Sequence, residues 1–293
     1  MKTLTIFTPA YNRANLLPRL YESLCNQTVQ DFEWLVVDDG SVDGTRALIA
    51  SWIQEQKIPI RYIYQENQGM HGAHNTAYHA IQTELNTCID SDDCMPHNAV
   101  DLILNKWNTV DKDKFAGIIG LDSFENGAII GTIMEAEETT LEDFYLKGGT
   151  GDKKLVYRTD VIKQYPDYPI FEGENYVGLA SKYILIDQDY KLAVLNEVLV
   201  IVEYQPTGSS NTMFLQYLKN PKGFMYYRTV FMLNSNSIKR RYREAIHYVS
   251  CCVILKKWNL FKACPKPGLT LLAVPFGVLL YFYILFKTRS KIH

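Results

Sequence analysis

The sequence predicts an α/β fold in which helices flank a mostly parallel sheet, with a helical segment at the C-terminus. Three observations lead to it: β-type and helical patterns alternate over the first 90 residues, polar clusters follow the predicted strands, and an uncharged apolar stretch lies near the end of the chain. The 293 residues suit one domain of about 200 residues with an appendage. We expect a first domain over 1–220, with halves at 1–95 and 96–220, and a helical region over 221–293.

The first strand is predicted at 4–8, a short β-rich apolar run, and the first helix at 15–27. The helix tolerates Pro18 because this residue falls in its first turn. One helical face is expected to hold four leucines, Leu16, Leu17, Leu20 and Leu24.

The second strand is predicted at 33–39, ends in two Asp residues and is followed by a helix at 41–56. We expect a helix cap at Ser41 or Asp43, because their side chains accept hydrogen bonds from free backbone N–H groups. The inward face of this helix is predicted to hold Leu48, Ile49, Trp52 and Ile53.

A third strand at 60–64, a helix at 70–81 and a fourth strand at 86–90 complete the alternation. This order implies parallel strands joined by right-handed crossovers. Ligands bind beyond the carboxyl ends of the strands in such sheets. The preference of Asp, Gly and Ser for turns and helix caps can explain any one polar cluster. Four such clusters at the same edge of the sheet favour a binding site. The clusters are "TPAYNR" (8–13), "DDGSVDGT" (38–45), "ENQG" (66–69) and "DSDD" (90–93).

The fourth cluster places three carboxylates within four residues, Asp90, Asp92 and Asp93. Such a cluster is stable when a hard dication neutralises it, and Mg²⁺ or Mn²⁺ is typically held by one or two carboxylates together with phosphate oxygens. In an extended segment Asp90 and Asp92 point the same way, but a turn after Ile89 would change that. The cluster therefore predicts a site for a metal and a diphosphate.

Several classes of protein are disfavoured. The net charge of −2 gives no basis for a nucleic-acid partner. The chain has neither a P-loop motif nor a G-x-G-x-x-G after the first strand, so a P-loop protein and a dinucleotide oxidoreductase are not expected. The six Cys form no C-x-x-C pair, and we expect them to be reduced thiols.

Four motifs, in this order and spacing, resemble the signatures of family 2 inverting glycosyltransferases of the GT-A fold, of the bacterial capsule and exopolysaccharide type. They are "TPAYNR" (8–13), "DDGSVDGT" (38–45), "NQGMHGAHN" (67–75) and "DSDD" (90–93). The resemblance is strong over residues 3–125 and moderate over 125–215. It implies a nucleotide-diphosphate-sugar donor, with a UDP-sugar expected. The stretch 131–158 resembles the variable part that faces the acceptor in such enzymes, and we expect Asp122 and Glu125 at the surface or in caps.

The resemblance also implies roles for individual residues. Asp92 would be the main metal ligand, with Asp90 contacting sugar or ribose and Asp93 supporting them. Asp39 would bind the base or ribose. The family often has Arg where this chain has His74, which is expected either to approach phosphate or sugar or to lie on the helix surface. The remaining residues implied for donor binding are Pro9, Ala10 and Tyr11 at the base, with Arg13, Asn67, Gly69 and Ser91.

Inverting transfer needs a carboxylate base opposite the leaving diphosphate, to take the proton of the acceptor hydroxyl. The segment 168–184 contains an "F-x-G-E" element like that of related bacterial polysaccharide enzymes, which points to Glu174. Glu172 is the alternative, because residues two apart on an extended loop aim the same way. There is no Q-x-x-R-W element, which favours addition of a single sugar.

Two C-terminal segments suggest a membrane partner. The stretch 237–257 reads as a basic amphipathic helix that lies on anionic lipid or packs on the catalytic domain. The uncharged stretch 269–286 has 18 residues, about 27 Å as a helix, so it either spans the membrane or lies in its interface. We therefore expect a lipid-linked saccharide acceptor and a location at the cytoplasmic face of the membrane. A homo-oligomer is left open.

Two rival functions are a sugar nucleotidyltransferase and a non-catalytic nucleotide-binding subunit of a membrane complex. The first typically has a Gly-rich loop with Arg and Lys after the first strand, where this chain supplies only Arg13. Intact Asp92 and Glu174 argue against the second. Turnover of a nucleotide-sugar would distinguish the glycosyltransferase from both of these rivals.

Overall fold

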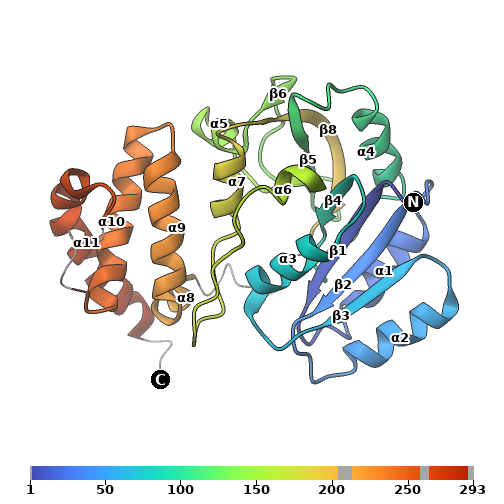
Figure 1. The fold of residues 1–293 in the computed structure, drawn as a ribbon, viewed down its shortest axis with the longest axis horizontal. Helices are drawn as coiled ribbons and strands as arrows, with labels where there is room; N and C mark the ends of the chain where they lie inside the picture. The colour runs from blue at the N-terminus through green and yellow to red at the C-terminus, as the bar shows by residue number, and fades with distance from the viewer. Residues whose placement is uncertain (1, 204–212, 258–263, 290–293) are drawn as a thin grey trace. The chain divides into compact units, whose positions relative to one another are not determined.

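The computed structural model describes residues 2–203, 213–257 and 264–289. The chain forms two compact units (Figure 1), Met1–Pro166 with Asp189–Gln205, and Asp167–Gln188 with Pro206–His293. This division differs from the predicted boundary at residue 220, since the segment that contains Glu172 and Glu174 groups with the C-terminal helices. Each unit is described by itself.

The first unit contains an eight-stranded sheet with the order β3-β2-β1-β4-β7-β5-β8-β6. The strands β1 to β4 are mutually parallel, which confirms the predicted alternation of strand and helix. Strand β7 is antiparallel to both β4 and β5 and joins the two halves of the sheet. The strands are β1 Leu4–Ala10, β2 Phe32–Asp38, β3 Ile60–Tyr64, β4 Leu85–Cys88, β5 Phe115–Ser123, β6 Glu138–Thr139, β7 Lys153–Arg158 and β8 Lys191–Ile201.

The helices α1, α2 and α3 follow β1, β2 and β3 as predicted. Helix α2 begins after Gly44 rather than at the predicted cap, but Asp43 still serves its start, because Thr45 donates its backbone N–H to Asp43 Oδ1 at 3.0 Å. The inward placement of Ile53 was wrong, because the packed stripe runs through Thr45, Ile49 and Trp52 and leaves Ile53 40% exposed. The helices of this unit are α1 Leu17–Cys25, α2 Thr45–Glu55, α3 Gly69–Ala80, α4 Ala99–Trp107, α5 Leu141–Leu146 and α6 Thr159–Ile162.

The core under β1 and β2 is aromatic. Trp34 on β2 is fully buried, and Tyr21 of α1 stacks on Trp52 of α2 with ring centroids 4.3 Å apart. Burial of side chains of this size contributes about 1.5–3 kcal/mol each. This packing fixes β1 and β2, and therefore the loops that follow them.

The second unit is helical, and α10 lies between α9 and α11 (Figure 1). The apolar face of α10 contacts protein: Ala245, Val249 and Cys252 belong to a buried cluster with Met232 of α9 and Ala273 of α11. The amphipathic pattern was expected to face either lipid or the catalytic domain, and in the structure it packs on the neighbouring helices α9 and α11. The helices are α7 Ala180–Ile186, α8 Met213–Lys219, α9 Pro221–Asn234, α10 Ile238–Ile254 and α11 Pro267–Thr288.

Candidate active site

The loops after β1 and β2 are hydrogen-bonded to each other. Asn12 donates its backbone N–H to Ser41 Oγ at 2.8 Å, and its side-chain oxygen accepts the N–H of Val42 at 2.9 Å. Arg13 donates its backbone N–H to Thr45 Oγ1 at 3.0 Å. The first two polar clusters therefore form one structure at the carboxyl edge of the sheet, as the sequence predicted.

The three residues predicted at the nucleotide base follow one another at this edge. Pro9 and Ala10 end β1 and pair in register with Val37 and Asp38 of β2. The next residue, Tyr11, is 48% exposed. An exposed aromatic ring at the end of a parallel strand can stack on a flat ligand.

Asp39 ties the second cluster to the third. Its carboxylate accepts hydrogen bonds from Gln65 Nε2 at 2.7 Å and from the backbone N–H groups of Gln68 and Gly69 at 2.9 and 2.8 Å. Asn67 Nδ2 donates to the Asp39 carbonyl at 2.8 Å. Burial raises the pKa of Asp39, while these hydrogen bonds oppose the rise. Asp39, Asn67 and Gly69, all predicted to bind the donor, thus lie together.

The fourth cluster is a turn. The backbone N–H of Asp93 donates to the Asp90 carbonyl at 3.1 Å, so the bend after Ile89 is present and the three carboxylates do not simply alternate as in a strand. Asp90 is exposed, Asp92 is half-buried, and Ser91 and Asp93 are buried. Asp93 Oδ1 accepts the N–H of Glu203 at 3.1 Å, which joins the turn to the end of β8.

Two carboxyl groups of this turn, those of Asp92 and Asp93, have raised pKa values. Burial, and then the charge of Asp90, raise the pKa of Asp92, and the same two causes raise the pKa of Asp93 to about 7. A dication would relieve this repulsion. Within the described ranges no group of three or more metal-binding side chains is assembled. Mg²⁺ commonly takes only one or two carboxylates and substrate phosphates, so the oxygen donors of this turn fit such an ion together with a diphosphate.

Two residues beside this turn have positions that the sequence did not predict. Lys154 of β7 donates from Nζ to the Cys88 carbonyl at 2.9 Å. Burial favours its neutral form, but Asp122, Asp90 and Asp93 raise its pKa to about 12. Asp122 was expected at the surface or in a cap and is instead 4% exposed on β5. Its Oδ1 has no hydrogen-bond partner in the described part of the chain.

His74 is buried, so the surface alternative was wrong. It is 1% exposed, its Nδ1 lies 2.8 Å from the Met70 carbonyl, and its ring meets the rings of Phe7 and Tyr78 edge-on. The core thus supplies its contacts in this structure. Its neighbour His71 is equally buried, and neither of its ring nitrogens has a hydrogen-bond partner among the residues described.

His71 is expected to make the stability of the first unit depend on pH. Burial lowers its pKa from 6.5 to about 4, so its contribution is fully present above pH 6.5 and is lost as the pH falls towards 4. The free energy of unfolding falls by at most about 3 kcal/mol over this pH range. A His71→Leu variant should show a smaller drop in melting temperature on acidification than the wild type. The exposed His79, replaced by Gln, is the control, and an unchanged pH dependence in His71→Leu would contradict the assignment.

The two candidate bases belong to the second unit and differ sharply. Glu174 is 7% exposed, and its two carboxylate oxygens accept the backbone N–H groups of Lys222 and Gly223, at 3.0 and 2.9 Å, in the first turn of α9. Glu172 is exposed, and its backbone carbonyl accepts Lys222 Nζ at 3.3 Å. Glu174 therefore caps a helix.

Comparison with known proteins gives the family. Residues 5–165 match the family described as glycosyl transferase family 2. The GalNAc(5)-diNAcBac-PP-undecaprenol beta-1,3-glucosyltransferase of Campylobacter jejuni is 31% identical over 266 residues, which cover 87% of this chain and 75% of that protein. Chondroitin synthase of Escherichia coli is 36% identical over 104 residues, 35% of this chain, and the chain spans only 15% of that much longer protein.

Solved structures agree on the fold. The S. aureus TarS 1-349 complex with UDP-GlcNAc superposes with a TM-score of 0.66 at 15% identity, over 99% of this chain and 92% of that one. The mannosyltransferase PcManGT of Pyrobaculum calidifontis, in complex with GDP-Man and Mn²⁺, gives 0.55 at 15% identity, over 98% and 75%. With the parallel β3-β2-β1-β4 core and its four polar loops, the chain belongs to glycosyl transferase family 2 and has the GT-A fold.

Proposed function

We propose that this enzyme transfers a single sugar, with inversion, from a nucleotide-diphosphate sugar to a lipid-linked saccharide during synthesis of a bacterial surface polysaccharide. The expected donor is a UDP-sugar, and the reaction takes place at the cytoplasmic face of the membrane. One observation carries the proposal: the joined loops around Asp39 and the carboxylate turn at Asp90–Asp93 follow neighbouring parallel strands of one sheet. The undecaprenol-linked substrate named for the Campylobacter relative supports the acceptor class.

In this proposal the joined loops bind the nucleotide. Pro9, Ala10 and Tyr11 border the base, and Asp39 holds the base or ribose while its other contacts keep the start of α3 in place. Arg13 is exposed, and its positive charge opposes the rise in the pKa of Asp92, so this guanidinium can also attract the donor's diphosphate. His74 is held at the Met70 carbonyl through Nδ1, and its donor-binding role stays a prediction.

The carboxylate turn would hold the metal. Asp92 is the proposed ligand for Mn²⁺ or Mg²⁺, which when bound neutralises charge on the leaving diphosphate. Asp90 faces solvent and is free to contact sugar or ribose, while Ser91 and Asp93 are buried beneath the turn. Lys154 contributes by holding the Cys88 carbonyl and by balancing part of the negative charge from below.

The proton of the acceptor hydroxyl needs a carboxylate with an available oxygen. Both oxygens of Glu174 accept backbone N–H groups, whereas the carboxylate of Glu172 is exposed. This contrast favours Glu172 as the general base and gives Glu174 the task of fixing the loop that carries it. Glu174 as base remains the alternative.

A donor screen tests the proposed function. Detergent-solubilised protein would be given a panel of nucleotide-sugars with Mn²⁺ or Mg²⁺, and release of nucleoside diphosphate would be followed with and without EDTA. We expect release from one donor, abolished by EDTA and restored by excess metal. Release that EDTA leaves unchanged would contradict the metal role. Formation of nucleotide-sugar from a nucleoside triphosphate and a sugar phosphate would indicate a nucleotidyltransferase instead.

A further inference from the structure

Helix α11 has two opposed faces. One is buried against the second unit and consists of Thr270, Ala273, Gly277, Ile284 and Thr288. The other, called here the outer face, holds seven large apolar side chains that are 48–72% exposed, Leu271, Leu272, Phe276, Leu279, Phe282, Tyr283 and Phe286. At 100° per residue these seven fall within an arc of about 140°.

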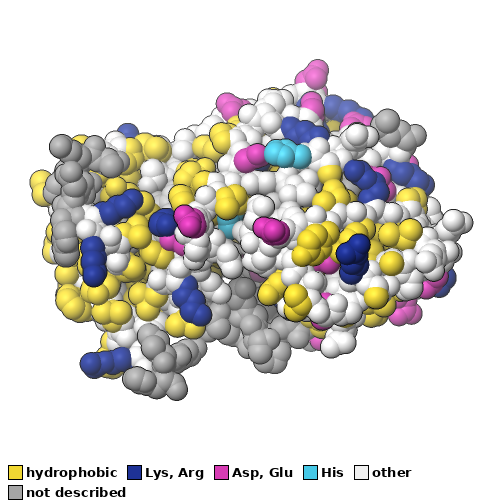
Figure 2. Space-filling view, turned by 60° about the horizontal axis from the view of Figure 1, so that its bottom comes forward, with side chains coloured by type: hydrophobic (Ala, Val, Ile, Leu, Met, Phe, Trp, Pro, Cys, Tyr) yellow, Lys and Arg dark blue, Asp and Glu magenta, His cyan; other side chains and the backbone are white. Residues whose placement is uncertain are grey.

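An apolar face of this size needs a partner. α11 is, within the described ranges, the one helix long and apolar enough to cross a membrane, and only 22% of its most apolar window is buried. It is therefore not a core helix. Contiguous apolar patches of this kind mark interaction sites with proteins or membranes. Figure 2 shows hydrophobic side chains gathered over the part of the second unit that holds α10 and α11, with Lys and Arg side chains among them.

The buried face of α11 is fixed closely on α10. A Cβ on Gly277 would lie 2.5 Å from Val249 Cβ and 2.8 Å from the Ile246 carbonyl oxygen, so the two backbones approach as only glycine permits. Tyr242 of α10 donates its hydroxyl to the Leu272 carbonyl at 3.1 Å, close to Pro275. Further along, Ile284 shares a buried cluster with Cys251. α11 can move into a membrane only together with α10.

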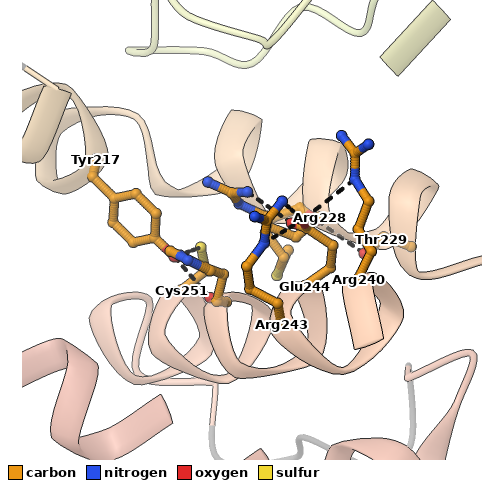
Figure 3. A network of polar contacts seen from close by, with 9 residues as sticks. Tyr217, Arg228, Thr229, Arg240, Arg243, Glu244 and Cys251 are labelled. Carbon is orange, nitrogen blue, oxygen red and sulfur yellow. Dashed lines mark hydrogen bonds and ion pairs between the residues drawn. The ribbon is translucent and has the colours of Figure 1, made fainter. Parts of the chain in front are cut away.

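A charged network around the buried Glu244 joins α10 to α9, and it cannot enter hydrocarbon cheaply (Figure 3). The Glu244 side chain is fully buried and accepts hydrogen bonds from Arg228 of α9 at 2.7 Å and from Arg243 at 2.9 Å, with Arg240 4.0 Å away. One carboxylate among three guanidinium groups leaves net positive charge. Each Arg placed at the centre of a bilayer costs about 2.5–3.5 kcal/mol or more. A spanning α11 would bring this network to membrane depth.

The charge of this part of the chain matches an anionic surface. Residues 213–293 contain fourteen Lys and Arg and a single acid, Glu244. Cations also stand at both ends of α11, Lys266 before it and Lys287 and Arg289 near its end. Cations at both ends of α11 can all contact the anionic cytoplasmic surface if the helix lies flat. If α11 crossed the membrane, the cations at one of its ends would lie on the opposite side.

We infer that α11 does not cross the bilayer but lies lengthwise in the interface of an anionic phospholipid membrane. Its outer face enters the acyl boundary, and the basic side chains of the second unit meet the headgroups. The inference rests on the proposed membrane association and specifies its geometry. It makes the enzyme a monotopic protein whose two units both stay on one side of the membrane.

Binding to lipid vesicles tests whether the outer face of α11 contacts a membrane. Full-length protein, free of detergent, would be centrifuged with vesicles of phosphatidylcholine with or without phosphatidylglycerol. The double variant Leu272→Glu, Leu279→Glu should bind anionic vesicles at least about tenfold more weakly, because two charges must then enter the apolar layer. The control Ile53→Glu changes a residue on α2 of the first unit that is 40% exposed and should bind as the wild type does. Circular dichroism melts would confirm that all variants fold.

The side of the membrane on which the end of α11 lies distinguishes a helix that lies in the interface from one that crosses the bilayer. An Arg289→Cys variant would be treated with a membrane-impermeant maleimide in inside-out and right-side-out vesicles, with the wild type giving the background from its six native cysteines. We expect extra labelling only in inside-out vesicles, on the same side as an Ile53→Cys reference. Extra labelling only in right-side-out vesicles would establish a span and overturn the inference.

Two further outcomes would also overturn it. A wild-type protein that ignores vesicles but still releases nucleoside diphosphate would refute membrane association while leaving the transferase intact. A concentration-dependent dimer that Leu272→Glu, Leu279→Glu converts to a monomer would show that a second copy of the chain covers the outer face.

Discussion

An Asp92→Ala variant is expected to lose metal-dependent turnover of the nucleotide-sugar, with kcat/KM reduced by about a thousandfold or more. Asp92 is half-buried, and the charge of Asp90 adds to burial in raising its pKa, so the turn concentrates negative charge that a dication would neutralise. Removing this carboxylate leaves the diphosphate without its proposed anchor. Binding of UDP by calorimetry should lose its enhancement by Mn²⁺ along with turnover.

Asp113→Ala is the matched control, because Asp113 is an exposed Asp of the same unit, in the segment before β5. It should leave turnover and metal-enhanced binding unchanged. If Asp92→Ala retained metal-enhanced UDP binding, the metal would have to be held elsewhere, and Asp90 would be the next carboxylate to replace. A stability measurement on Asp92→Ala separates this result from misfolding, and we expect the variant to be at least as stable as the wild type because it relieves repulsion.

The first half of the fold could be predicted because its signals are local. Alternation of apolar runs and helical periodicity place β1 to β4 and α1 to α3 within a few residues of the structure. The loops at their carboxyl ends follow from the parallel topology, and the contacts of Asp39 with Gln68 and Gly69 bring two of them together. These residues were found because the sheet places consecutive loops side by side.

The residues that were missed depend on long-range pairing. Lys154 reaches the carboxylate turn only because β7 inserts between β4 and β5, with Thr87 opposite Val156. No local sequence pattern predicts that a strand will insert antiparallel at this place. The resemblance placed residues 131–158 in a variable region, whereas the last six of the segment form this central strand. Asp122 was misplaced for the same reason, since all nine residues of β5 are buried.

Amphipathic patterns have a similar limit. The apolar face of α10 would look the same whether it met lipid or protein, and in the structure Val249 lies against Gly277 of α11. The segment that does face outward is α11, whose composition is apolar all round. Periodicity could therefore not tell which of its faces is covered, and the packing of Gly277 and the exposure of Leu279 were needed to decide.

Replacing Glu172 by Gln is expected to lower transfer to the acceptor by about a hundredfold to ten-thousandfold while donor binding is kept, because a positioned base supplies about that much. The amide has the same shape but cannot take a proton. The exposed position of Glu172 also means that the substitution should leave the melting temperature within about a degree of the wild type. Glu22→Gln, on the exposed side of α1, controls for loss of a surface carboxylate.

Glu174→Gln should behave in the opposite way. Its amide oxygen can accept one of the two N–H groups of α9, but its NH₂ group would face the other, so a buried donor is left unsatisfied at a cost of about 1–3 kcal/mol. We therefore expect a lower melting temperature for this variant, with a smaller loss of transfer than in Glu172→Gln. If Glu174→Gln instead abolishes transfer at full stability and with donor binding intact, Glu174 is the base, and its two hydrogen bonds to α9 serve to aim a reactive carboxylate.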